Sequence, residues 1–295
     1  MFKKIIVLTS IPFILLLVAY FYGVYKNNRS VPYPQTTQIQ TQLERSINWL
    51  VNNEANILSN NNVMLWWMLY EAHKISADER LADLLEKYHQ RYRRIKMSIW
   101  GPLFDGRQHR RLGGYMVEGL PYYNQHFIYA LNCAADIEDE LIIVAQQNRA
   151  DFCHQAAYFY RPACTTHQLM GINFLFTKQC NLLPNIDEMS QALQQDIVGQ
   201  LTWDIRVVDV YLQRVLMLLI TGAQDSIKPV WIQQVLDHQL ADGGWGDFVS
   251  LLGSETERSI GFSSKVISLG REQSSFHATA QGVYILTYLL ERNET

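Results

Sequence analysis

Asp209 carries a carboxylate and His277 an imidazole, and these two groups could act together in a reaction. A carboxylate and an imidazole can move a proton to or from a substrate, or hold a divalent cation. Asp209 lies on an apolar predicted helix, where Arg206 and Gln213 extend a polar stripe along the same face. Because Arg206 comes three residues before Asp209, an ordinary ion pair between the two is the alternative explanation of this carboxylate.

His277 lies in the first turn of the last predicted helix, which covers about residues 275–291. Gln281 and Tyr284 follow it at helical spacing and predict a polar and aromatic face. We expect these two side chains to contact a ligand bound near His277. The alternative is that His277 only satisfies hydrogen bonds at the start of its helix.

Two further histidines are candidates for the same site. His126 shares a predicted helical face with Tyr122, and we expect it to take part in acid–base chemistry beside Asp209 and His277. His167 follows Cys164 by three residues, so the two could share a metal ion. Since no second pair of metal ligands recurs as in a zinc ribbon, a disulfide with a buried histidine is the alternative there.

The segment 98–123 is rich in glycine, proline and charge, which predicts a long loop. Arg107 and Arg110 in this loop could hold an anionic group such as a phosphate or a carboxylate. The alternative is a solvated surface loop. The sequence contains no Gly-x-Ser-x-Gly motif and no glycine-rich phosphate-binding loop placed after a strand.

A glycine-rich turn at residues 237–246 follows an amphipathic helix predicted over residues 229–240. Gly243 and Gly244 end this helix where a left-handed backbone is usually required, and Trp245 can fold back as an apolar plug. The run Gln-x-x-Asp-Gly-Gly-Trp-Gly resembles the signature repeated in terpenoid cyclases and protein prenyltransferase β-subunits. In those families it joins helices of an α/α toroid, so the resemblance implies a toroid for residues 41–295.

The resemblance to prenyltransferase β-subunits also implies a partial metal site. Those enzymes hold a catalytic zinc with an Asp and a Cys two residues apart and with a His on a later helix. Asp209 and His277 match that order and approximate spacing, and His167 is the remaining candidate ligand. Tyr211 stands where the thiolate should be, so zinc-thiolate prenyl transfer is not expected and Tyr211 becomes a predicted ligand contact.

Residues 5–25 form an uncharged apolar run, long enough to span a bilayer. We predict a signal anchor over residues 1–26 and a polar tether over residues 27–40, with a cleaved signal peptide as the alternative. Lys3, Lys4 and the amino terminus before the run exceed Lys26 and Arg29 after it by one positive charge, which favours a cytoplasmic N-terminus and an extracytoplasmic body. Disulfides are then permissible, and Cys153–Cys164 or Cys164–Cys180 are the plausible pairs.

Helical periodicity dominates the rest of the chain, and no sustained strand pattern is evident. The net charge of −3 does not favour nucleic acid as a partner. We therefore predict one all-α domain behind a membrane anchor. The predicted helices cover about residues 42–51, 63–73, 81–95, 124–135, 149–160, 166–178, 189–200, 204–221, 229–240 and 275–291.

Two functions remain open at this point. In the first, the cavity of the toroid binds a lipid, a glycan or an envelope protein without the complete catalytic set of its relatives. In the second, an enzyme uses Asp209 and His277, with His126 or His167, for acid–base or zinc-assisted chemistry on a prenyl, lipid-linked or glycan substrate.

Overall fold

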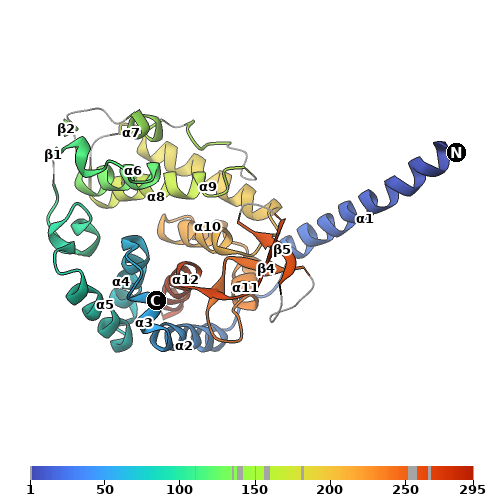
Figure 1. The fold of residues 1–295 in the computed structure, drawn as a ribbon, viewed down its shortest axis with the longest axis horizontal. Helices are drawn as coiled ribbons and strands as arrows, with labels where there is room; N and C mark the ends of the chain where they lie inside the picture. Colours follow the sequence, from blue (N-terminus) through green and yellow to red (C-terminus); the bar gives the residue numbers. More distant parts are fainter. Residues whose placement is uncertain are drawn as a thin grey trace.

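The computed structural model is mostly helical, with small sheets (Figure 1). It describes residues 2–109, 111–134, 136–137, 142–149, 151–155, 160–180, 183–251, 258–264 and 267–294, with residues 2–13 described by their backbone alone. A long N-terminal helix, α1, projects from a helical body (Figure 1). The prediction of a helical body is therefore confirmed for most of the described chain.

The helices lie mostly where apolar periodicity predicts them, and side-chain caps define some of their starts. Asn62 accepts a hydrogen bond from the backbone of Met64, and Asp78 does the same for Arg80. The α-helices are α1 (Phe2–Asn28), α2 (Thr36–Asn52), α3 (Glu54–Ile57), α4 (Val63–Ser76), α5 (Glu79–Arg91), α6 (Tyr122–Asn132), α7 (Ile142–Gln147), α8 (Cys164–Thr177), α9 (Ile186–Trp203), α10 (Asp209–Ile220), α11 (Pro229–Asp237) and α12 (Phe276–Glu294).

Four predicted helices differ from the structure by four residues or more. The helix predicted over residues 42–51 begins at Thr36, and the helix predicted over residues 81–95 ends at Arg91. The predicted helix over residues 149–160 forms turns and bends in its described parts, and the short α7 precedes it. The helix predicted from residue 204 begins five residues later, at Asp209. The reason is that Asp204 is occupied by ion pairs with Arg206 and Arg214, which hold the preceding segment outside the helix.

Five helices form a continuous series of packed neighbours. Helix α4 packs on α12, α12 on α10, α10 on α8, and α8 on α6. The short 3-10 helix η2 (Gly101–Phe104) contacts both α4 and α6, the two ends of this series. The helices that alternate with these five along the chain pack against them: α5 on α4, α7 on α6, α9 on α8, α11 on α10, and α2 on α12.

Two cavities lie at opposite ends of these five helices. The N-end cavity has a volume of about 660 Å³ and the C-end cavity about 320 Å³. Each helix contributes an earlier residue to the N-end cavity and a later one to the C-end cavity, so the five helices run in the same direction. These pairs are Met64 and Lys74 in α4, Asn124 and Leu131 in α6, His167 and Thr177 in α8, Gln213 and Ile220 in α10, and His277 and Tyr284 in α12.

A layer of aromatic rings lies between the two cavities. The Trp67 ring meets the rings of Phe174 and Tyr284 edge to face, at centroid distances of 5.2 and 6.0 Å. Phe127 meets Phe174 in the same way at 5.6 Å. Edge-to-face packing of this kind adds to the hydrophobic stabilisation of a core. Because Phe127 lines the N-end cavity whereas Trp67, Phe174 and Tyr284 line the C-end cavity, the layer separates the two cavities.

The glycine-rich turn has the geometry that its sequence predicts. Gly243 has a φ of +97°, in the left-handed region, and a side chain there would overlap the backbone of Arg45 in α2. Trp245 is 1% exposed, and a side chain at Gly282 of α12 would overlap its ring. The turn therefore fixes the end of α11 against both α2 and α12.

Strands occur between α11 and α12, where none was predicted. β4 (Phe248–Ser250), β5 (Ser259–Ser263) and β6 (Ile267–Gly270) form a three-stranded antiparallel sheet. The other described strands are two residues long. β1 (Arg111–Leu112) pairs with β2 (Asp136–Ile137), and β3 (Trp245–Gly246) pairs with β7 (Ser274–Ser275). The prediction of a purely helical body is wrong here, because the alternation of Ile260 and Phe262 with small residues suits a strand.

Helix α1 is fixed to the body by its last turn. Asn27 is 2% exposed, donates to the Leu201 carbonyl, and accepts the Tyr211 hydroxyl proton at 2.9 Å. The Trp231 indole donates to the Asn27 carbonyl at 2.9 Å. The predicted tether over residues 27–40 is therefore shorter in the structure, because residues 27–28 belong to α1 and residues 36–40 belong to α2.

The sequence predicts that α1 crosses a membrane. Among the described residues, no helix combines the length and the apolar character needed to cross a bilayer. Residues 1–13, which supply much of the predicted span, lie outside the described side chains. The anchor over residues 1–26 stays a prediction.

All four cysteines form disulfides. Cys153 pairs with Cys164, as one of the predicted pairs, and Cys133 pairs with Cys180. The predicted alternative Cys164–Cys180 is wrong, since both partners are used elsewhere. The Cys133–Cys180 bond ties the end of α6 to the residues just after α8, two helices that line both cavities.

Replacing Asn27 by alanine should destabilise the body. The Tyr211 hydroxyl and the Leu201 carbonyl would each lose a buried partner, at a cost of about 2–3 kcal/mol in the free energy of unfolding. Denaturant unfolding of the full chain in mild detergent measures the effect. Asn52→Ala, at the exposed end of α2, is the control and should change stability by less than about 0.5 kcal/mol. Equal effects of the two substitutions would contradict the role given to Asn27.

Candidate functional site

The N-end cavity has a wall of aromatic and methionine side chains and a polar end. Its polar residues include His167 of α8, Gln213 of α10 and His277 of α12. Cavities of this size and composition are the usual form of small-molecule sites. The apolar wall is made by Met64, Met68, Tyr88, Tyr92, Trp100, Tyr123, Phe127 and Met170.

Asp209 contacts His277, which lines this polar end of the cavity. His277 Nδ1 lies 3.3 Å from Asp209 Oδ2, and the two residues occupy the first turns of α10 and α12. The predicted proximity of these two side chains is therefore confirmed. The alternative partner, Arg206, is bound to Asp204 by two contacts of 2.7 Å, so it does not account for Asp209.

Asp247 joins this pair as a third group that the sequence did not predict. Ligand atoms of Asp209, Asp247 and His277 all lie within 4.8 Å of one another, and no other such group of three is found in the described part of the chain. The Ser275 hydroxyl donates to Asp247 Oδ1 at 2.7 Å and orients the carboxylate. Asp247 directly follows the Gly-Gly-Trp-Gly turn, and that position is the only sequence signal that could have found it.

The charges of the cluster alter its protonation. Burial opposes the imidazolium form of His277, but the hydrogen bond and charge of Asp209 and the charge of Asp247 outweigh it, so the pKa of His277 is raised above its ordinary value. Loss of hydration and the nearby charge of Asp209 raise the pKa of the Asp247 carboxyl, against the effects of Ser275 and His277. A cation within the cluster would relieve the repulsion between the two carboxylates.

His167 presents a neutral imidazole to the same cavity. Its Nδ1 lies 2.7 Å from the Ala163 carbonyl, which fixes the proton on that nitrogen and leaves a lone pair on Nε2. Burial lowers the pKa of His167 to about 4, although the hydrogen bond to Ala163 opposes this. The structure does not include His167 in the three-residue group, so its predicted place as third ligand passes to Asp247.

Unpaired buried atoms surround the Asp209–His277 contact. Asp209 Oδ1 and Gln281 Oε1 are both shielded from solvent without a hydrogen-bond partner. Buried carboxylate oxygens are normally bound, so an unpaired one indicates a group yet to be supplied. Two carboxylates and one imidazole are a donor set that suits zinc with an open coordination position. The residues present therefore fit a divalent cation.

His126 lies away from this cluster. Its ring is fully buried, Nε2 lies 3.1 Å from the Asn148 side chain, and burial lowers its pKa to about 4. A side chain at Gly171 of α8 would overlap the His126 ring, so the ring packs directly on that helix. The prediction of a catalytic His126 is not supported by this placement, because the ring fills the contact between α6 and α8.

The remaining predicted ligand contacts are dispersed. Tyr211 is buried and bonds to Asn27, whereas Tyr284 lines the C-end cavity. Gln281 lies behind His277, with its Nε2 3.3 Å from His277 Nε2. Arg107 is exposed on its loop, outside the residues that line the N-end cavity. Arg110 lies outside the described residues.

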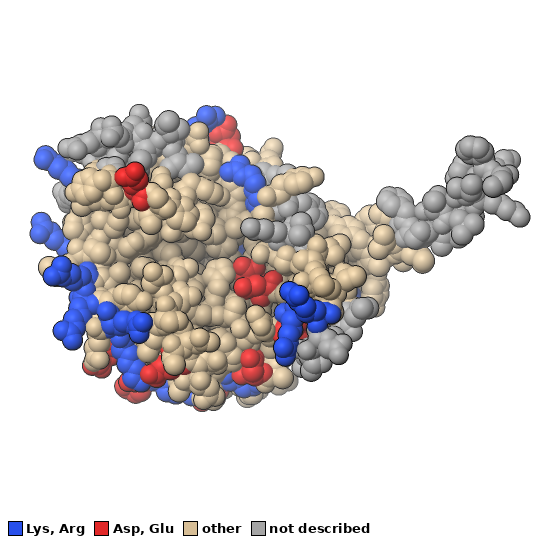
Figure 2. Space-filling model, viewed as in Figure 1, with Lys and Arg blue, Asp and Glu red and all other residues tan. Residues whose placement is uncertain are grey.

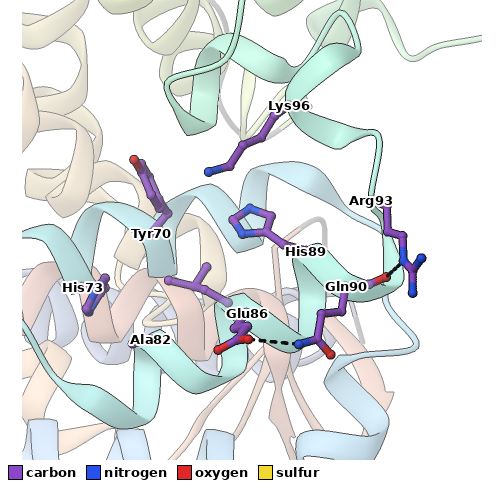
Figure 3. A pocket seen from close by; sticks show the side chains of 9 residues that line it. Tyr70, His73, Ala82, Glu86, His89, Gln90, Arg93 and Lys96 are labelled. Carbon is purple, nitrogen blue, oxygen red and sulfur yellow. Dashed lines mark hydrogen bonds between the residues drawn. The ribbon is translucent and has the colours of Figure 1, made fainter.

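A shallow outer cleft lies between α4 and α5 on another part of the surface. Figure 3 shows His89 and Lys96 beside Tyr70, with Glu86 bonded to Gln90. On the face drawn in Figure 2, basic side chains gather along the edge of the body that carries α5. Among the described residues of this cleft, no three carboxylates or histidines lie close enough to hold a metal ion together. The N-end cavity is therefore the better candidate for the functional site.

The chain was compared with protein-family models, with curated proteins and with solved structures. None of the three comparisons gives a match. The functional assignment therefore depends on the geometry of the cavity and its polar end.

The raised pKa of His277 should depend on Asp209. Asp209→Asn removes the charge that favours the imidazolium, so the pKa of His277 should fall in an NMR titration of the imidazole signals. Asp196→Asn is the matched control, because Asp196 pairs with His154 at 3.0 Å outside the cavity. An unchanged His277 titration in Asp209→Asn would contradict the contact.

The same substitution should change the pH dependence of stability. Because the folded-state pKa of His277 is raised, its stabilising effect is fully present below the unfolded value of about 6.5 and is lost as the pH rises through the folded value. The stability difference between the natural chain and Asp209→Asn should therefore be largest below that value and shrink at higher pH. Denaturant unfolding across this pH range measures it.

The packing of His126 on Gly171 should appear as energetic coupling. Gly171→Ala should cost about 1–3 kcal/mol because the added methyl displaces the His126 ring. In a chain that also carries His126→Ala, the methyl has room and the Gly171→Ala cost should fall. Gly199→Ala is the control, since a side chain there meets open space on α9. Additive costs in the unfolding experiment would place His126 elsewhere.

Proposed function

We propose that this chain is a metal-assisted enzyme that binds an amphipathic substrate in the N-end cavity. The observation that carries the proposal is the group formed by Asp209, Asp247 and His277, whose ligand atoms lie within 4.8 Å of one another and of which His277 lines the N-end cavity. Asp209 Oδ1 is buried without a hydrogen-bond partner, so it is open to a cation. The substrate's apolar part fits the aromatic wall, and its reacting group fits the polar end.

The helix directions support this placement of the reacting group. Five helices have their N-terminal turns at the N-end cavity, and the N-terminus of a helix carries a partial positive charge. Their combined field favours a substrate with a polar or anionic end over a cationic one. The C-end cavity faces the opposite ends of the same helices and has the opposite preference.

We propose further that the alternating helices form an α/α toroid. The series α4, α12, α10, α8 and α6 would be the inner helices, and η2 would bridge the two ends of the series. Helices α2, α5, α7, α9 and α11 would be the outer ones, because they alternate with the inner set along the chain and pack against it. The common direction of the five inner helices supports this arrangement.

The roles of individual side chains follow from their contacts. Asp209, Asp247 and His277 would hold a divalent cation such as zinc, which supplies Lewis acidity to a substrate oxygen. His167 remains neutral at ordinary pH and can accept a proton at Nε2. Gln213, whose side-chain oxygen accepts from Thr166, lines the same end and can donate its amide hydrogens to a substrate. The aromatic layer that includes Trp67 would keep water in the C-end cavity from reaching the N-end cavity.

The compartment and the membrane attachment are part of the proposal. Helix α1 would anchor the chain in a membrane with the body on the extracytoplasmic side. The two disulfides support an oxidising compartment. The exposed apolar side chains of α1 support attachment to lipid, and they include Leu16, Val18 and Phe21.

A cavity that only binds is the second candidate function. Tyr211 takes the position of the thiolate in prenyltransferase β-subunits, and its hydroxyl is committed to Asn27. The chain therefore lacks the thiolate ligand found in the enzymes that its sequence resembles. In this reading a lipid, glycan or envelope protein would occupy the N-end cavity without reaction.

Metal content separates the two candidates. The full chain, purified in detergent without chelators, should carry a stoichiometric divalent metal by mass spectrometry of the dissolved protein. Asp209→Asn and His277→Gln should each weaken zinc affinity by at least about 100-fold in a chelator competition. Asp196→Asn should leave the metal content and the affinity unchanged.

Two results would contradict a cation site at Asp209 and His277. If the natural chain binds zinc no more tightly than the Asp209→Asn variant does, the metal-assisted function is excluded. A chain that carries metal in both Asp209→Asn and His277→Gln would place the ion at another site.

A further inference from the structure

The three-stranded sheet turns one apolar face outward. Its register pairs Val249 with Phe262, Phe262 with Ile267, and Ile260 with Leu269. Paired residues of antiparallel strands project to the same face, and so do residues two apart on one strand. All five side chains therefore share a face, on which Ile260, Ile267 and Leu269 are 54%, 63% and 61% exposed.

The opposite face of the sheet carries its internal packing. Phe248 projects to that side, and side chains at Gly261 or Gly270 would overlap its ring. The remaining residues on that side are serines, such as Ser250 and Ser259, whose hydroxyls bond at 2.7 Å. The sheet therefore packs through its small-residue face and leaves the apolar face without a described partner, an arrangement that marks an interaction surface.

This apolar face is connected to the base of α1. A side chain at Gly23 of α1 would meet the side chain of Ile205, and the next residue, Arg206, donates to the Ser264 carbonyl at the end of β5. Tyr20 of α1 donates to the carbonyl of Trp203, whose ring is 49% exposed. Figure 1 shows β4 and β5 beside the point where α1 leaves the body.

The composition of the combined surface matches a lipid interface. Aromatic residues with polar tips concentrate in the headgroup layer of a bilayer, and apolar side chains lie just below it. Arg258 and Arg271 flank β5 and β6 at one end of the sheet and can reach anionic headgroups. On α1 the exposed apolar and aromatic side chains are Ile14, Leu15, Leu16, Leu17, Val18, Phe21, Tyr22 and Tyr25.

We infer that the outer face of the β4–β5–β6 sheet, together with Trp203, lies in the interfacial layer of a lipid bilayer beside α1. The inference rests on the proposed anchoring of the chain by α1 and does not depend on the metal site. Two attachments, the helix and the sheet, would fix the orientation of the body on the membrane. The sheet would then hold the loop that carries Asp247 next to the source of a membrane-derived substrate.

Site-specific fluorescence tests this contact in the full chain. All four natural cysteines are in disulfides, so a single new cysteine can carry an environment-sensitive dye. The positions are Ile260→Cys and Leu269→Cys on the sheet, Leu16→Cys on α1, and the control Met97→Cys, which is 76% exposed after α5. Each protein is reconstituted into vesicles of equal parts phosphatidylcholine and phosphatidylglycerol, without and with a quencher on the lipid chains.

The dye at the two sheet positions should shift its emission to shorter wavelength and lose intensity with lipid-borne quencher, as at Leu16, while the dye at Met97 should do neither. A lipid signal at Leu16 alone would overturn the sheet contact and leave the anchor in place. Aqueous signals at all four positions would overturn both.

A shift at residues 260 and 269 that needs no vesicles and grows with protein concentration would assign the face to a second copy of the chain. Unfolding midpoints equal to that of the natural chain verify that the labelled proteins are folded.

Discussion

The contact between Asp209 and His277 depends on the way in which helices α10 and α12 begin side by side at one end of the body. Each residue lies in the first turn of its helix, so a small rotation or shift of either helix would separate them. The glycine-rich turn holds α12 in place, because Trp245 is packed on Gly282 of α12 and Gly243 on α2. The same turn leads directly into Asp247, and the structural motif thereby supplies the third member of the cluster.

Competition for arginine explains why Asp209 is left available. Asp204 lies five residues earlier and is bound by both Arg206 and Arg214, each at 2.7 Å. These are buried ion pairs, and removing either partner would leave an uncompensated charge at a cost of several kcal/mol. The arginines are therefore held away from the N-end cavity. Asp209 meets an imidazole in place of a permanent cation, so its second oxygen stays open to a ligand.

Local sequence patterns predicted most helices and the left-handed turn at Gly243, whereas the proximity of Asp209 to His277 was implied by the resemblance to prenyltransferase β-subunits. They failed where a contact depends on distant partners: Tyr211 bonds to Asn27, 184 residues away along the chain, and no local period indicates this. The packing of His126 on α8 was not predicted either, because it depends on the small Gly171, which is 45 residues away along the chain. The strands of the sheet were missed because they are short, and Asp247 because it follows a turn without periodicity.

The central claim is that three side chains from separate parts of the last third of the chain form one cation site in a helical cavity. A crystal structure of the full chain grown with zinc, with diffraction data collected on both sides of the zinc absorption edge, tests it most directly. We expect an anomalous peak between Asp209, Asp247 and His277, at about 2.0–2.2 Å from their ligand atoms. A map with α10 and α12 apart, or with zinc bound only elsewhere, would contradict it.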